Sequence, residues 1–199
     1  MNRKIQYTKR VIQENFLLLL KEKPIGKITV AEICAMADVN RCTFYQHYSD
    51  IYDLLEQLED DLYNKFTNIQ PLTKEHTFES ITASVITLIY QTRELGIVLL
   101  GDNGDTPFLE KLLDFCRQNT FTKYKTMKIP EKDWEFIFTY VTSGCIGILR
   151  TWFDSDFKES QETIIHYIDQ LSAYGYSAFG TQNRLSGRQG LSARGNSES

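Results

Sequence analysis

The chain has few residues that interrupt helices. Its 199 residues include only four prolines and 11 glycines, which favours helices over a loop-rich scaffold. The length indicates one large domain or two small ones. No segment alternates convincingly between apolar and polar residues, as a half-buried strand does. We therefore expect an all-α protein.

Cysteines and long apolar runs are also scarce. Because the cysteines lack metal-ligand spacing and a secretory context, we interpret them as reduced thiols. They are Cys34, Cys42, Cys116 and Cys145. The N-terminus has no apolar core followed by a cleavage site, and no stretch approaches the ~20 apolar residues of a membrane span. We predict a cytoplasmic protein with no membrane partner.

The sequence contains no motif for catalysis. It has no Gly-rich phosphate loop, no cluster with metal-ligand spacing and no nucleophile motif. The three histidines are scattered, and none has a plausible nucleophile beside it in the sequence. We predict that the protein is not an enzyme and needs no cofactor.

Charge is distributed unevenly along the chain. Residues 1–48 contain eight Lys or Arg and four Asp or Glu, a balance of +4, which leaves −8 for the rest of a chain whose net charge is −4. A basic N-terminal segment followed by an acidic body is a pattern that can indicate nucleic-acid binding. Segments this short also vary by several charges without a functional reason.

Two short predicted helices follow a longer amphipathic one that ends before Pro24. Thr29 and Glu32 form a capping-box pattern at the start of the first short helix. Residues 38–40 interrupt that helix, and Asn40 is a suitable N-cap for the second, from Arg41 to about Tyr48. This is the helix-turn-helix pattern, in which the second helix enters the DNA major groove.

The second short helix has two unlike faces. On a helical wheel, Phe44 and Tyr48 point inward, whereas Cys42 and Gln46 lie on the opposite side. Gln, Arg and Thr side chains pair with base edges, and hydroxyl or N–H groups bind phosphates. Solvated surface helices carry such residues too. The predicted DNA-binding residues are Thr29, Arg41, Cys42, Thr43, Tyr45, Gln46 and His47.

Longer helices are predicted over the rest of the chain. Apolar stripes at helical spacing lie within residues 55–69, 78–89, 108–116, 134–152 and 164–179. Ser49 or Asp50 caps the first of these helices, and a turn is expected at 101–105. Residues 181–199 lack aromatic residues and are rich in Ser, Gly, Asn, Gln and Arg, so we expect a disordered tail.

The segment Ile28–Tyr48, ITVAEICAMADVNRCTFYQHY, resembles the N-terminal domain of the tetracycline-repressor (TetR) family. That family's pattern has an Ile-Thr start, an Ile-Ala pair, an Ala-Gly-Val-Ser turn and Thr-Phe-Tyr-x-His-Phe. The likeness extends over about the first 65 residues. It implies a ligand-responsive transcriptional regulator, expected to be a repressor, that binds palindromic operator DNA as a homodimer and releases it when an unknown small-molecule effector binds.

The sequence departs from the family pattern at three places. Asp38 replaces a frequent Gly of the turn, and Asp tolerates the left-handed backbone. Cys42 stands where a small residue is common. Ser49 and Ile51 replace lysines that often touch phosphates, which lowers non-specific affinity. The alternative is therefore a TetR-fold adaptor or coactivator that acts through a partner protein with weak or no DNA reading.

Two segments of the C-terminal body, 99–109 and 147–153, resemble a subgroup similar to the regulator of dihydroxyacetone kinase operons. In that subgroup one member acts through a partner protein, which favours the same alternative. The family resemblance divides the chain into a helix-turn-helix domain at 1–49, a helical ligand-binding and dimerisation domain at 50–180 and the tail.

Two further sets of residues are candidates for binding. Small residues on the last two predicted helices would let a second subunit approach closely, or pack within their own subunit. These small residues are Ser143, Gly144, Gly147, Ser172 and Gly175, and Tyr176 beside them is a further candidate for the dimer interface. The effector pocket is expected between residues 78 and 153, among residues that also suit an ordinary core. The candidates are Phe78, Tyr90, Leu99, Phe115, Phe138, Tyr140, Thr142 and Trp152.

Overall fold

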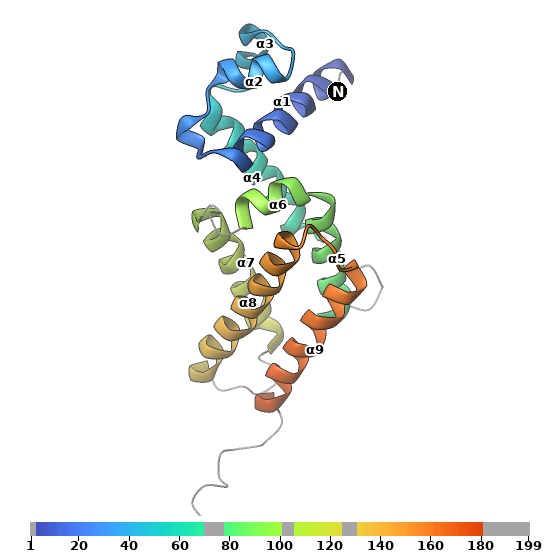
Figure 1. Ribbon diagram of the computed structural model, residues 1–199. Helices are drawn as coiled ribbons and strands as arrows, with labels where there is room; N and C mark the ends of the chain where they lie inside the picture. The colour runs from blue at the N-terminus through green and yellow to red at the C-terminus, as the bar shows by residue number, and fades with distance from the viewer. Residues whose placement is uncertain (1–2, 70–77, 101–105, 125–130, 181–199) are drawn as a thin grey trace, which may run out of the picture.

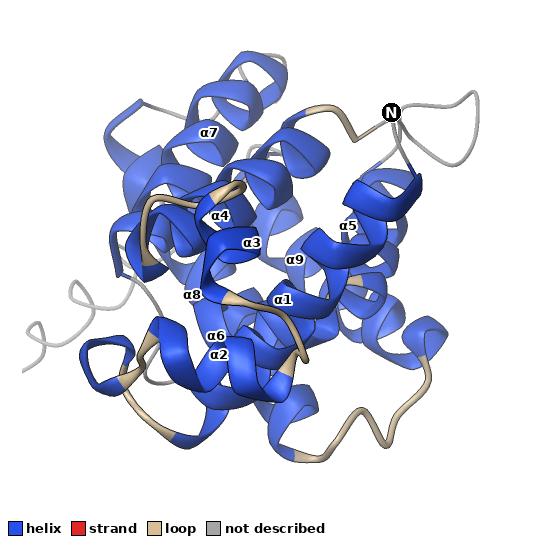
Figure 2. Cartoon of the chain, turned by 90° about the horizontal axis from the view of Figure 1, so that it is seen from above, coloured by secondary structure: helices blue, strands red, loops and turns tan. Residues whose placement is uncertain are grey.

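The computed structural model describes residues 3–69, 78–100, 106–124 and 131–180, and over these residues the chain is helical without strands (Figure 2). The all-α prediction is confirmed. The helices are α1 (Arg3–Glu22), the 3-10 turn η1 (Ile25–Lys27), α2 (Val30–Met36), α3 (Arg41–Tyr45), α4 (Ile51–Thr67), α5 (Phe78–Gln91), α6 (Arg93–Leu100), α7 (Thr106–Tyr124), α8 (Glu131–Asp154) and α9 (Gln161–Gly180). The predicted turn at 101–105 and the tail at 181–199 lie outside the described residues.

The molecule is elongated, with α1, α2 and α3 at one end (Figure 1). Helix α4 runs from this end into the body formed by α5 to α9, and α6 lies across the body just below α1. Within the body, α9 packs against both α5 and α8. The arrangement places α3 far from the free ends of α8 and α9.

Side-chain caps define the helix boundaries of the N-terminal segment. The Thr29 hydroxyl accepts a hydrogen bond from the N–H of Glu32 (3.2 Å), and the Glu32 carboxylate accepts one from the N–H of Thr29 (2.9 Å). This capping box is as the sequence predicts. Asn40 accepts the N–H of Thr43 at 2.7 Å, and Asp50, rather than Ser49, caps α4.

One apolar core joins the N-terminal helices to the body. Phe16 and Ile33 are fully buried in it with Phe44 of α3, and the buried residues of α4 continue it towards α5 and α6. Burial of each such side chain stabilises the fold by roughly 1.5–3 kcal/mol. A second, smaller cluster forms around Trp134 and Phe138 of α8.

The structure differs from the sequence prediction at the end of α5. The sequence predicts no separate helix at 93–100, but α6 begins at Arg93 and is bent by 98° from α5. At the bend, the Thr92 hydroxyl donates to the carbonyl of Leu88 (2.8 Å), a local bond that competes with a regular helix. The guanidinium of Arg150 on α8 donates to the carbonyl of Leu100 (3.1 Å) and fixes the far end of α6.

Two smaller differences concern α3 and α9. Helix α3 ends at Tyr45 instead of near Tyr48, although the N–H of Tyr48 still bonds to the carbonyl of Phe44 (3.0 Å). Leu171, which the sequence places on the apolar stripe of the last helix, is 61% exposed. Its position one turn beyond the buried Ile168 leaves it outside the subunit core.

Among the described residues, α8 is the one unbroken helix whose length and apolar composition would allow it to cross a membrane. Its bulky residues Trp134, Phe138 and Trp152 are nevertheless buried inside the protein. About a third of this apolar stretch is buried within the subunit, so α8 has one face in the core and one face exposed.

Adjacent aromatic residues in α3 give a direct test of this fold. Phe44 is fully buried, whereas Tyr45 is 57% exposed. We predict that Phe44→Ala lowers the free energy of unfolding by about 3–5 kcal/mol because it leaves a cavity. The matched variant Tyr45→Ala should change it by less than about 0.5 kcal/mol. Urea denaturation followed by circular dichroism measures both, and equal effects would contradict the orientation of α3.

Candidate nucleic-acid interface

Helix α3 lies at the end of the molecule (Figure 1), and most side chains on its outer side are polar and exposed. Phe44 and Tyr48 are buried and anchor its inner side. Six of the predicted DNA-binding residues lie on α3 or directly after it. The exposed ones are Arg41, Cys42, Tyr45 and Gln46, and the half-buried ones are Thr43 and His47. The outer face therefore carries a guanidinium, a thiol, a phenol and an amide within one turn and a half of chain.

The two threonines of this region have structural roles as well. The Thr29 hydroxyl donates to the carboxylate of Glu32 (2.9 Å), and the Thr43 hydroxyl donates to Asn40 (3.0 Å). Both hydroxyls thus help to cap a helix. Thr29 is exposed at the start of α2, so the capping contacts leave it on the protein surface.

Several cations of the N-terminal segment are paired within the protein. Arg10 lies 3.5 Å from Glu14, and Lys21 of α1 bonds to Glu94 of α6. Lys23 contacts Glu32 at 2.6 Å, and together with the Thr29 hydrogen bonds it lowers the pKa of Glu32. Of these three pairs, only Lys21–Glu94 uses a carboxylate outside residues 1–48, so it alone lowers the balance of +4 that is available to a polyanion.

Negative charge lies directly after the polar face of α3. Asp50 caps α4 and Asp53 lies in its first turn. The N–H of Ser49, followed by the amide of Gln57, lowers the pKa of Asp53, so this carboxyl group is ionised at neutral pH. Two carboxylates thus stand close to the positions where the family pattern often has lysines.

The candidate pocket residues occupy separate places in the body. Tyr90 stacks on the buried Trp152, with ring centroids 5.9 Å apart. Phe115 instead contacts Tyr63 and Phe66 of α4.

The remaining pocket candidates are more widely spread. Leu99 is buried in the main core, whereas Phe138 belongs to the second cluster. Thr142 donates its hydroxyl to the carbonyl of Phe138 (2.7 Å). Tyr140 is 75% exposed, and the side chain of Phe78 lies outside the described residues. The described candidates are thus spread over the main core, the second cluster and the protein surface, and a common effector pocket stays a prediction.

The small residues of α8 face outward. Ser143, Gly144 and Gly147 are exposed, and a Cβ added at either glycine meets no atom within 4 Å. Packing within the subunit therefore does not require glycine at these positions. Ser172 of α9 is different, because it is buried with its hydroxyl 4.0 Å from the thiol of Cys145. The side chains of Gly175 and Tyr176 lie outside the described residues.

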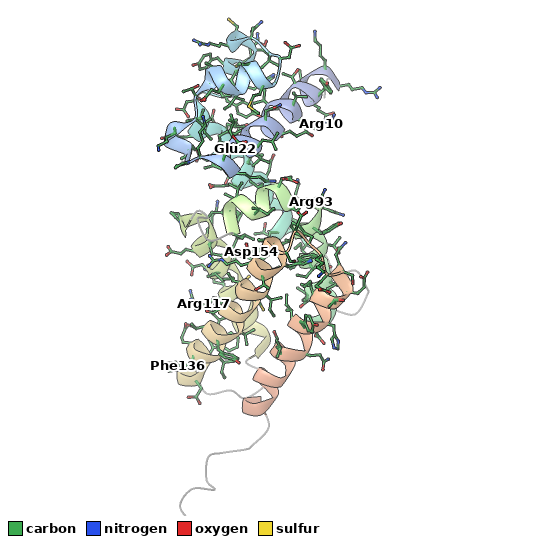
Figure 3. The ribbon with its side chains drawn as sticks, viewed as in Figure 1. Arg10, Glu22, Arg93, Arg117, Phe136 and Asp154 are labelled. Carbon is green, nitrogen blue, oxygen red and sulfur yellow. The ribbon has the colours of Figure 1, made fainter. Side chains whose placement is uncertain are left out.

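An exposed apolar surface surrounds these glycines. Phe136 and Tyr140 of α8 are 79% and 75% exposed, and Tyr167 and Leu171 of α9 are at least half exposed. Phe136 projects from the lower part of α8, far from the N-terminal helices (Figure 3). Tyr140, Gly144 and Leu171 also line a hollow of about 400 Å³ between α8 and α9. Exposed apolar surface of this kind marks interaction sites in soluble proteins.

Comparison with known proteins identifies the family. A TetR C-terminal family described as "Transcriptional regulator C-terminal region" matches residues 76–174. The crystal structure of a TetR transcriptional regulator from Streptococcus agalactiae 2603V is 27% identical, covers 85% of this chain and 96% of that chain, and has a TM-score of 0.59. The chain belongs to the tetracycline-repressor family of transcriptional regulators. The N-terminal resemblance and the C-terminal match therefore agree.

Two more distant solved structures share the fold. The dihydroxyacetone kinase operon activator DhaS is 18% identical, with 86% of this chain and 97% of that chain covered and a TM-score of 0.56. The fatty acid degradation regulator FadR from Bacillus halodurans is 11% identical, with coverages of 89% and 96% and a TM-score of 0.65. A comparison with curated proteins gave no match.

Regulators of the TetR family bind DNA and are not enzymes, and they are soluble proteins.

The cysteines provide a test of the exposed face of α3. Cys42 is exposed, whereas Cys34 is buried and Cys116 and Cys145 are half-buried. Burial raises the pKa of Cys116 to about 11 and also raises the pKa of Cys34 and Cys145, so these three thiols have little reactive thiolate near neutral pH. We predict that brief treatment of the folded protein with N-ethylmaleimide modifies Cys42 first.

Peptide mass spectrometry identifies the labelled residue in this experiment. The variant Cys42→Ser serves as the control and should remain unlabelled over the same period. Comparable labelling of Cys34 in the wild-type protein would contradict the packing of α2 beneath α3.

Proposed function

We propose that this TetR-family protein is a ligand-responsive transcriptional repressor that binds palindromic operator DNA as a homodimer. The observation that carries the proposal is the outer face of α3, where Arg41, Cys42 and Gln46 are exposed while Phe44 anchors the helix from behind. Arginine pairs well with guanine, and glutamine with adenine, in the major groove. Thr43 suits a thymine methyl or a base edge. Tyr45, His47 and Thr29 supply phosphate contacts in this proposal.

We assign DNA binding and dimerisation to opposite parts of the elongated molecule. Residues 1–49 read DNA, and residues 50–180 bind the effector and form the dimer, with the tail at 181–199 outside both functions. Two copies joined through α8 and α9 would place two α3 helices for half-sites one DNA turn apart, ~34 Å. The exposed glycines and apolar side chains of α8 and α9 support this interface.

The proposed effector is a small molecule that binds within the body of a cytoplasmic regulator. Of the candidate lining residues, Tyr90, Leu99 and Trp152 belong to the core that adjoins α6. Helix α6 contacts α1 and is bonded to it through Lys21 and Glu94. A ligand that displaced these residues would therefore act close to the N-terminal helices, which supports an effector site here.

A second candidate function is an adaptor or coactivator that acts through a partner protein and has weak or no DNA reading. The presence of Ser49 and Ile51 in place of lysines favours it, because fewer cations then lie beside the end of α3 where phosphates would approach. The structural similarity to an operon activator, DhaS, is consistent with this alternative at the level of the fold.

Selection of bound fragments from a random duplex library separates the two functions. The wild-type protein should enrich a palindromic sequence. We predict that Gln46→Ala relaxes the base preference at one position per half-site, a loss of about 1–3 kcal/mol of discrimination. Tyr45→Ala and His47→Ala should weaken binding to all sequences alike because they contact phosphates.

Glu22→Gln, an exposed change in the last turn of α1, serves as the control for these variants. No enrichment by the wild-type protein would favour the adaptor function. Enrichment that all three α3 variants leave unchanged would refute the role of this helix.

The dimer is testable at Gly147. Because an added Cβ there meets no atom of the same subunit, we predict that Gly147→Leu keeps the thermal stability of the subunit but converts a dimer into a monomer at micromolar concentration. Light scattering measures the mass, and circular dichroism the helical content. Glu22→Leu, among the N-terminal helices (Figure 3), should remain dimeric. A monomeric wild-type protein would count against the interface.

A further inference from the structure

A network of polar side chains joins the end of α3 to α4, and no sequence pattern predicts it. Gln57, two turns into α4, donates its amide to the carboxylate of Asp53 (2.9 Å). The same carboxylate accepts the backbone N–H of Ser49 (2.6 Å) and the Ser49 hydroxyl (3.0 Å). These bonds hold the chain directly after α3 against the first turn of α4. We call Lys9, Ser49, Asp53 and Gln57 the junction network.

The network also includes α1. The ammonium group of Lys9 donates to the side-chain oxygen of Gln57 (3.2 Å) and lies 5.3 Å from the ring centroid of Tyr48. Gln57 makes a longer contact, 3.4 Å, with the backbone carbonyl of His47. One side chain therefore contacts groups from α1, from the end of α3 and from α4.

The chemistry of the partners fixes the orientation of the Gln57 amide. An ammonium group only donates hydrogen bonds and an ionised carboxylate only accepts them. The amide oxygen must therefore face Lys9 and the amide nitrogen must face Asp53. The N–H of Ser49 and the Gln57 amide lower the pKa of Asp53, which keeps the acceptor charged and its hydrogen bonds strong.

The apolar contacts of α3 leave its tilt loosely determined, and the junction network restricts that tilt. Phe44 and Tyr48 are buried and determine which face of α3 is inside. Apolar contacts are non-directional, so they constrain the tilt of a five-residue helix only weakly. The hydrogen bond that the Ser49 N–H donates to Asp53 and the one that the Gln57 amide donates to the His47 carbonyl are directional. They attach the end of α3 to α4, and Lys9 adds the link to α1.

From this geometry we infer that Gln57 is a positioning residue for DNA reading: through Asp53, the His47 carbonyl and Lys9 it sets the direction in which α3 presents its outer face. The inference rests on the proposed function. It assigns Gln57 no contact with DNA. Its loss should reduce sequence-specific binding, which depends on the exact placement of base-contacting groups, more than non-specific binding, which depends on charge.

The test uses Gln57→Ala, which leaves the charge of the full-length protein unchanged. We expect affinity for the selected operator duplex to fall about tenfold, the scale of one or two lost hydrogen bonds. Affinity for a scrambled duplex of the same length should change less than about twofold, because charge sets it. The control is Asn64→Ala, an exposed neutral change on the same helix.

A second readout works without DNA. In the free protein, amide hydrogen exchange at Ser49 should become faster in Gln57→Ala than in the wild type or in Asn64→Ala, because its acceptor Asp53 is no longer held. Asp53→Ala should accelerate exchange further, and Asp53→Asn, which retains an acceptor oxygen, should restore part of the protection. Asp53→Ala should also weaken operator binding even though it removes a negative charge, which by itself would strengthen it.

The outcomes separate this inference from the function on which it rests. If the wild-type protein binds no duplex, the proposed function fails and the role of Gln57 in DNA reading fails with it. If the wild type binds its operator and Gln57→Ala binds equally well, the positioning role alone is overturned. Unchanged exchange at Ser49 in Gln57→Ala would overturn it too. Equal losses on operator and scrambled DNA would show a general effect on the fold and also overturn it.

Discussion

The burial of Phe44 and Tyr48 is the constraint on which the exposed face of α3 depends. A helix of five residues is far too short to be stable by itself, so α3 exists because these two rings enter the core that contains Phe16 and Ile33. Since the rings lie on one side of the helix, their burial forces Cys42 and Gln46 outward. The side chain of Asn40 then caps the first turn, and the same contacts that stabilise the helix determine what it can bind.

Charge places a second constraint on the same surface. Pairing of Lys21 with Glu94 of α6 reduces the positive field, and Asp50 and Asp53 add negative charge next to α3. Binding of a duplex by this surface would therefore depend more on well-placed contacts than on net attraction. The proposed role of the junction network fits this requirement, because its directional hydrogen bonds would hold the DNA-contacting side chains of α3 in place.

The opposite end of the molecule has a different chemistry. There α8 and α9 expose aromatic and leucine side chains around two glycines that their own subunit does not need for packing. A polar surface at one end and an exposed apolar surface at the other are what the proposed dimeric DNA-binding regulator requires. Helices α4 and α6 connect the two ends, since both contact the body and the N-terminal helices.

The sequence by itself determined the local features of this protein. Thr29 with Glu32, and Asn40, act within three residues of chain, so their caps could be predicted from spacing, as could the inward side of α3 and the family pattern. The bend between α5 and α6, the exposed positions of Tyr140 and Leu171, and the hydrogen bonds of Gln57 depended on the tertiary structure. These features arise from contacts between segments far apart in the chain, such as Arg150 with Leu100 and Lys9 with Gln57. Helical periodicity shows which residues share a face, but only packing decides whether that face is covered and by what.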